Sequence, residues 1–270
     1  MLVGIFIISG EKGVCFLMDY SRLMLDNIER ERTGTDYRYP DSDRAILREM
    51  FDDIKNSTGV SVHYLAEMDA YNIEGAGNII AKYITMFSSE SVKGYLIPQI
   101  VAAKVKDCDR LLLQLYLHFK DSNEYISKPH LPAPAHIYTR YDNAFKTLKP
   151  KKLKIDLTKL AYSPRDAFYL PFTMRMLASW RIPELEDVFI SYLDETIITA
   201  QSIGLCENVK DYFPSLAFVR SEIRLLAVDA LKYYPSSKVM LLIEKLATDP
   251  NPNIQAIAKK TMKYLSSSTK

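Results

Sequence analysis

Two stretches near the C-terminus repeat one pattern of apolar residues: residues 223–234 read IRLLAVDALKYY, and residues 254–265 read IQAIAKKTMKYL. A shift of 31 residues superimposes Ile223 on Ile254, Leu226 on Ile257, Ala227 on Ala258, Leu231 on Met262 and Tyr234 on Leu265. In both stretches the apolar residues recur at the spacing of one helix face. A fixed period that joins amphipathic helices is typical of stacked helical hairpins, whose surfaces mostly bind other macromolecules.

The residues around these stretches predict further helices in pairs. Pro183 and Pro235 each separate the two members of a pair, and Pro is well placed near a helix start. The predicted helices are Arg165–Trp180 with Glu184–Thr199, Tyr212–Tyr234 with Ser237–Thr248, and a last helix at Asn253–Leu265.

Residues 249–254 read DPNPNI and resemble the turn that begins a HEAT repeat of the short bacterial type, with the pattern D-x-x-P-x-V/I-R. Gln255 stands where the family usually has arginine, and Arg224 supplies that arginine one repeat earlier. The alanines of the two repeated stretches match the small residue of the inner helix. The resemblance is clearest in residues 210–265, and it implies an α-solenoid whose repeats must stack to bury their apolar faces.

The resemblance weakens toward the N-terminus, so we divide the chain into three parts. Residues 157–270 are expected to be HEAT-like repeats, residues 127–156 a connection rich in proline and lysine, and residues 1–126 an irregular helical region. Residues 2–20 are equally compatible with a β-hairpin, because short apolar runs do not distinguish strands from a buried helix. The predicted fold class is all-α, and whether the first part joins the repeat array stays open.

The composition indicates a soluble globular protein. Of the 270 residues, 48% are hydrophobic and 25% are charged, and the net charge is only +2, which disfavours a generally basic nucleic-acid binder. The three cysteines lie far apart, so a disulfide framework is not expected. The apolar run at residues 2–8 is too short to span a bilayer and follows no basic residue. We therefore expect a cytoplasmic protein with no membrane partner.

The residue types that usually hold cofactors lack the spacing for it. His130 and His136 lie six residues apart without a carboxylate or cysteine at a metal-ligand spacing. Gly75 and Gly77 lack both the third glycine of a dinucleotide fingerprint and the Lys-Ser/Thr of a phosphate loop. The sequence therefore predicts no metal, no cofactor and no recognisable catalytic residues.

Two groups of residues are candidates for binding. Lysines of the connection, together with arginines of the repeat region, form a candidate anion-binding set, with a solvated loop as the alternative interpretation. Tyrosines in segments expected to be loops are interface candidates, with local packing as the alternative. The candidate residues are Lys146, Lys149, Lys151, Lys152, Lys154, Arg220, Arg224, Tyr138 and Tyr141.

Three hypotheses for the function follow. The favoured one is a non-catalytic protein-protein interaction scaffold, such as an immunity-type or regulatory binding protein of bacteria. The second is nucleic-acid binding or DNA base repair, because some DNA glycosylases that excise alkylated bases are built from HEAT-like repeats. Those enzymes use tryptophans and a carboxylate, which here would be Trp180 and Glu184, although a second tryptophan is absent. The third is an enzyme whose site the sequence does not reveal.

Overall fold

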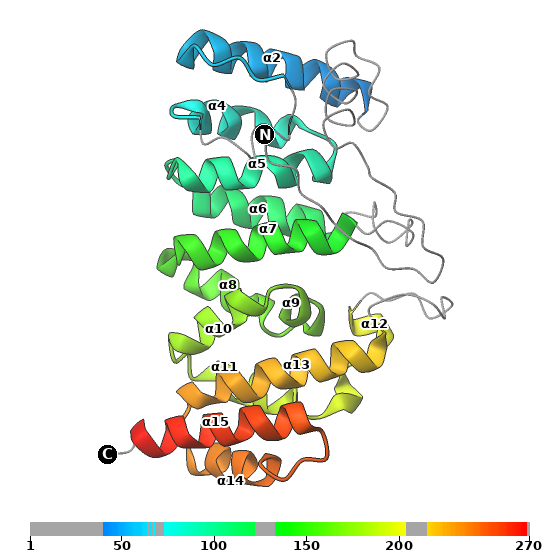
Figure 1. The fold of residues 1–270 in the computed structure, drawn as a ribbon, viewed down its shortest axis with the longest axis vertical. Helices are drawn as coiled ribbons and strands as arrows, with labels where there is room; N and C mark the ends of the chain where they lie inside the picture. The colour runs from blue at the N-terminus through cyan, green and yellow to red at the C-terminus, as the bar shows by residue number, and fades with distance from the viewer. Residues whose placement is uncertain are drawn as a thin grey trace, which may run out of the picture. The chain divides into compact units, whose positions relative to one another are not determined.

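In the computed structural model, all regular structure of the described residues is helical, as the sequence predicts (Figure 1). The described residues are 40–63, 65, 67, 73–121, 133–203 and 215–268. The alternative of a β-hairpin at residues 2–20 lies outside them. No helix within these ranges has both the length and the apolar character needed to cross a membrane.

The chain divides into two compact units: unit 1 is Met1–Gln99 and unit 2 is Ile100–Lys270. The division falls within α5 (Glu90–Ala102), upstream of the connection that the sequence suggested at residues 127–156. A composition rich in proline and lysine therefore does not coincide with the division between the compact units.

Unit 1 contains α2 (Asp41–Thr58), which packs against α4 (Ala76–Tyr83), followed by the short 3₁₀ helix η1 (Ile84–Met86) and most of α5. Met50 and Ile54 of α2 and Ile80 of α4 are fully buried in its core. Gly59 ends α2 in the left-handed region at φ 75°, which glycine adopts without a steric penalty.

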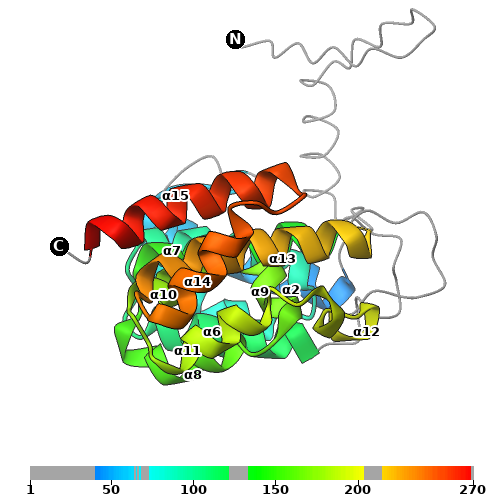
Figure 2. The same cartoon turned by 90° about the horizontal axis from the view of Figure 1, so that it is seen from below.

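Unit 2 contains α6 (Cys108–Asp121), α7 (Ala133–Leu148), η2 (Lys151–Leu153), α8 (Lys154–Leu160), α9 (Pro164–Tyr169), α10 (Pro171–Ser179), α11 (Glu184–Ser191), η3 (Glu195–Ile197), α12 (Ala200–Ile203), α13 (Leu216–Ala230), η4 (Leu231–Tyr233), α14 (Ser237–Leu246) and α15 (Pro252–Ser268). Helix α7 contacts α10, α10 contacts α13, and α13 contacts α15, while α11 contacts α13 and α14 contacts α15. Figures 1 and 2 both show α13 beside α15. We call α7, α10, α13 and α15 the central row.

Three of the five pairs matched by the 31-residue shift are buried in both members, whereas Ile257 and Met262 are partly exposed although Leu226 and Leu231 are buried. Ile223 and Ile254 are fully buried, and so are Ala227 and Ala258. Thr261 of α15 is also buried, and its Oγ1 donates a hydrogen bond of 3.1 Å to the carbonyl oxygen of Val228 in α13. Helix α15 thus packs directly against α13, and the alanines and isoleucines of the repeated stretches belong to the core of unit 2.

Two sequence predictions of helix bounds are wrong. The helix expected at Arg165–Trp180 is divided into α9 and α10, because Pro171 cannot donate to the helix that precedes it. The helix expected at Glu184–Thr199 ends at Ser191.

The connection expected at residues 127–156 is helical in much of its described part, because α7 runs without interruption from Ala133 to Leu148. Pro134 lies in the first turn of α7, where the missing N–H costs no intrahelical hydrogen bond. Pro134 therefore marks the beginning of a helix.

Buried aspartates hold the starts of later helices in both units. Asp142 of α7 accepts hydrogen bonds from the backbone N–H groups of Phe172 (2.9 Å) and Thr173 (2.7 Å) at the start of α10. Asp43 of α2 does the same for Ser88 (2.8 Å) and Ser89 (2.7 Å), just before α5. Each carboxylate thus satisfies N–H groups that have no partner within their own helix.

Candidate functional site

The five candidate lysines are exposed, on the last turn of α7, the turn that follows it, η2 and the start of α8. Among these lysines, only Lys146 contacts an aromatic ring of the described residues: its Nζ lies 4.1 Å from the ring centre of Phe172. The five lysines are therefore near one another in sequence, and all of them face solvent.

The two candidate arginines are engaged in contacts within unit 2. Arg220 Nε donates to the carbonyl oxygen of Ile198 at 2.9 Å. Arg224 forms ion pairs with Glu195 (3.3 Å) and Asp249 (2.5 Å). These contacts tie α13 to the segment before α12 and to the turn before α15, which is a structural role.

The structure corrects the prediction for Tyr138 and Tyr141, which lie in α7 and not in loops. Both are buried, and Tyr138 stacks on Tyr169 with ring centres 4.0 Å apart. Burial raises the pKa of Tyr138. Both side chains therefore belong to the core, so the alternative of local packing holds.

Trp180 and Glu184 lie on either side of the turn that joins α10 to α11. Trp180 is half-buried at the C-terminus of α10, and Glu184 is exposed at the start of α11. Neither side chain lines the groove that lies between α9, α10, α13 and α15.

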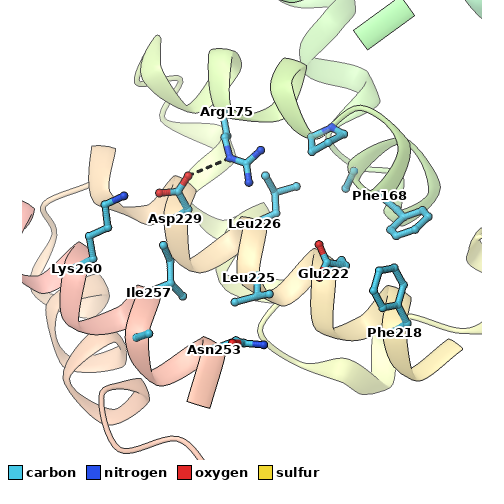
Figure 3. A pocket seen from close by; sticks show the side chains of 13 residues that line it. Phe168, Arg175, Phe218, Glu222, Leu225, Leu226, Asp229, Asn253, Ile257 and Lys260 are labelled. Carbon is cyan, nitrogen blue, oxygen red and sulfur yellow. Dashed lines mark hydrogen bonds and ion pairs between the residues drawn. The ribbon is translucent and has the colours of Figure 1, made fainter. Parts of the chain in front are cut away.

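An open groove of about 790 Å³ crosses the surface of unit 2 between α9, α10, α13 and α15 (Figure 3). Four of its lining residues come from α9 and α10, five from α13 and four from α15. The lining residues are Ala167, Phe168, Pro171, Arg175, Phe218, Glu222, Leu225, Leu226, Asp229, Asn253, Ala256, Ile257 and Lys260.

Apolar side chains line much of the groove. Phe168 and Phe218 meet edge to face, with ring centres 6.3 Å apart, and Phe218 is 38% exposed. Leu225 of α13 and Ile257 of α15 are partly exposed farther along the groove. This apolar surface is open to solvent, whereas Ile223, Ala227, Ile254 and Ala258 are fully buried.

One end of the groove carries a fixed ion pair. Arg175 Nε donates to Asp229 Oδ2 at 3.0 Å, and Lys232 Nζ contacts Asp229 Oδ1 at 2.8 Å. Burial alone would raise the pKa of Asp229, but the hydrogen bonds and charges of Lys232 and Arg175 outweigh it, so the pKa is lowered. Asp229 is therefore ionised at neutral pH, with two cations around it.

Two charged groups of the groove have no ion-pair partner among the described residues. Lys260 is exposed near Asp229, and Glu222 is exposed one turn from Phe218 on the same face of α13 (Figure 3). The groove thus combines apolar surface with a cationic end and an acidic end.

Sequence reasoning missed this groove, although α13 contains a signal for it. Phe218, Glu222, Leu225 and Asp229 recur at the spacing of one helix face. The core face of α13 already has its own residues, including Ile223 and Ala227, so an additional stripe with an exposed phenylalanine indicates a second contact surface.

Comparison with models of known protein families, with curated proteins and with solved structures gives no match. No group of histidine, cysteine or carboxylate side chains that could hold a metal ion occurs within the described ranges.

Proposed function

We propose that unit 2 is a stack of HEAT-like repeats that acts as a non-catalytic scaffold and binds another protein in the groove between α9, α10, α13 and α15. The stack is supported by the order of contacts along the central row and by the equal burial of Ile223 with Ile254 and of Ala227 with Ala258. Alanine at positions 227 and 258 has a small side chain, which lets adjacent helices approach closely.

The groove itself is the observation that carries the proposed binding function. Exposed phenylalanine and aliphatic side chains lie together there, with charged residues at its edges. Apolar patches with a polar rim are typical of protein-protein contact surfaces, in which aromatic residues are enriched. An immunity-type or regulatory role in the cytoplasm fits such a scaffold, on the analogy of fold and composition.

The test compares two substitutions of aliphatic residues by arginine. Ile257→Arg places a charge in the groove, whereas Leu241→Arg does so at a 68% exposed position on α14, outside the groove lining. The tagged protein and both variants are used to capture proteins from the native host at high salt. We expect the unaltered protein and Leu241→Arg to retain the same stoichiometric partner, and Ile257→Arg to lose it.

Retention of that partner by Ile257→Arg would contradict binding in the groove. Circular dichroism melting curves must show that both variants fold. This control matters because a misfolded protein would lose any partner.

A further inference from the structure

Resting on the proposed function, the geometry points to the kind of segment that the groove accepts. We propose that it binds an amphipathic α-helix about three turns long, acidic in its first turn and basic in its last, and antiparallel to α13.

The length follows from the residues that line the groove. On α13 they extend from Phe218 to Asp229, which corresponds to about 16 Å at the rise of an α-helix. On α15 they extend from Asn253 to Lys260, and Figure 3 shows both sets running in the same direction. A partner helix of about three turns lying along these two helices would cover the groove from end to end.

The cationic end is suited to a carboxylate. Asp229 holds Arg175 through Nε, while the terminal nitrogens of Arg175 make no hydrogen bond within the part of the chain that the structure describes. A guanidinium fixed in this way presents two parallel N–H groups to an incoming carboxylate. Lys260 lies at the same end and adds a second charge (Figure 3).

The acids at this end do not cancel that charge. Asp229 is shared between Arg175 and Lys232, so one carboxylate faces two cations. Asp142, whose charge also interacts with Arg175, is buried and engaged by the backbone N–H groups of Phe172 and Thr173. The exposed balance at this end of the groove is therefore positive.

The opposite end is suited to a cation. Glu222 is exposed and lies one helical turn from Phe218, whose ring meets that of Phe168. A lysine or arginine of the partner that reaches this end meets a carboxylate and the faces of aromatic rings together.

These two ends determine the direction of the bound helix. Helices favour acidic residues in the first turn and basic residues in the last, because of the helix dipole. A helix of that kind places its first turn beside Arg175 and Lys260 and its last turn beside Glu222. It therefore runs opposite to α13, and the reverse orientation brings like charges together.

The experiment uses two synthetic peptides of three turns with the same composition. Both peptides carry leucine at i, i+4 and i+7, and both have blocked termini and a fluorescent label. A side-chain lactam on the face opposite the leucines stabilises the helix, because so short a helix is not stable alone. The acid-first peptide has glutamates in its first turn and lysines in its last, and the base-first peptide has these exchanged. Fluorescence anisotropy measures the binding of each to the full chain at low salt.

We expect the acid-first peptide to bind about fivefold more tightly, which corresponds to two exposed ion pairs. The double variant Glu222→Lys/Lys260→Glu should reverse this preference. The matched control Glu244→Lys/Lys259→Glu makes the same exchange at exposed positions outside the groove lining and should leave the preference unchanged.

Equal binding of the two peptides, abolished by Ile257→Arg, would overturn the charge-directed orientation while leaving a binding groove in place. Binding of neither peptide would overturn the helical occupant. The capture of a host protein that depends on Ile257 is a separate result, so the proposed function can fail or stand independently.

Discussion

Tyr138 and Tyr192 are both buried in unit 2, but their hydroxyl groups have different surroundings. Tyr192 Oη donates to the carbonyl oxygen of Ala161 at 2.6 Å, whereas Tyr138 Oη makes no hydrogen bond of normal distance and angle among the described residues and interacts with the charge of Arg165. A buried polar group without a partner costs free energy, and a satisfied one contributes modestly. Deleting the hydroxyl group should therefore cost more stability in Tyr192 than in Tyr138.

We expect Tyr192→Phe to lower the free energy of unfolding by about 1 kcal/mol, because the Ala161 carbonyl loses its donor. Tyr138→Phe should leave it unchanged or raise it by up to about 1 kcal/mol. Urea unfolding at pH 7 measures both. A loss in Tyr138→Phe equal to that in Tyr192→Phe would show that the Tyr138 hydroxyl is hydrogen-bonded in solution.

Burial raises the pKa of both tyrosines, which predicts a loss of stability at alkaline pH. In the unfolded chain tyrosine titrates near pH ~10, so above that pH the unfolded state releases protons that the folded state retains. Tyrosine titration should therefore leave the free energy of unfolding unchanged at pH values below ~10. Above that pH the free energy of unfolding should fall as the pH rises. In Tyr138→Phe the fall should be shallower, by up to about 1.4 kcal/mol per pH unit. Urea midpoints at pH 9, 10 and 11 give the slopes, and identical slopes would contradict the prediction.

At the scale of the helix, one buried carboxylate of α7, that of Asp142, holds the start of α10. Asp142→Ala leaves the buried N–H groups at the start of α10 without their acceptor. We expect a loss of about 2–3 kcal/mol in the free energy of unfolding. Asp142→Asn keeps an acceptor oxygen and should lose about half as much. Equal losses in the two variants, measured by urea unfolding, would show that the carboxylate charge and not the hydrogen bonds stabilises α10.

The contact of α13 with α15 predicts a second effect at this scale. Ala227→Leu adds volume at a fully buried position and should lower the free energy of unfolding by about 1–3 kcal/mol. Ala256→Leu introduces the same side chain at an exposed position of α15 and serves as the control. An unchanged melting midpoint in Ala227→Leu would mean that this alanine does not form the helix contact.

The accuracy of the sequence predictions varied with the helix, for physical reasons. Helices α13, α14 and α15 were predicted near their observed bounds, because apolar residues at helical spacing and prolines at the turns act locally. Helix α7 was missed because Pro134 lies in its first turn, where proline is tolerated. The sequence contains a signal for the α13 face of the groove alone, because the rest of the groove requires α9, α10 and α15 to meet α13 in space.

At the scale of the whole molecule, the charge predicts weak and salt-sensitive contact with nucleic acid. The net charge is +2, and the exposed lysines between Lys146 and Lys154 form the densest run of cations along the chain. If all five contacted phosphates, affinity for a short DNA duplex would fall by about 500-fold between 50 and 200 mM salt. We therefore expect no retention of labelled DNA at 200 mM salt, measured by fluorescence anisotropy. Tight binding that persists at that salt would revive the nucleic-acid hypothesis.

The bond between Thr261 and Val228 restricts how this protein can vary in evolution. A buried carbonyl oxygen of one helix depends on a hydroxyl group that comes from another, 33 residues later. Serine preserves the donor, whereas valine has the same shape but leaves the oxygen unpaired. In a mutational scan under selection, position 261 should accept serine and reject valine, although size alone would favour the reverse.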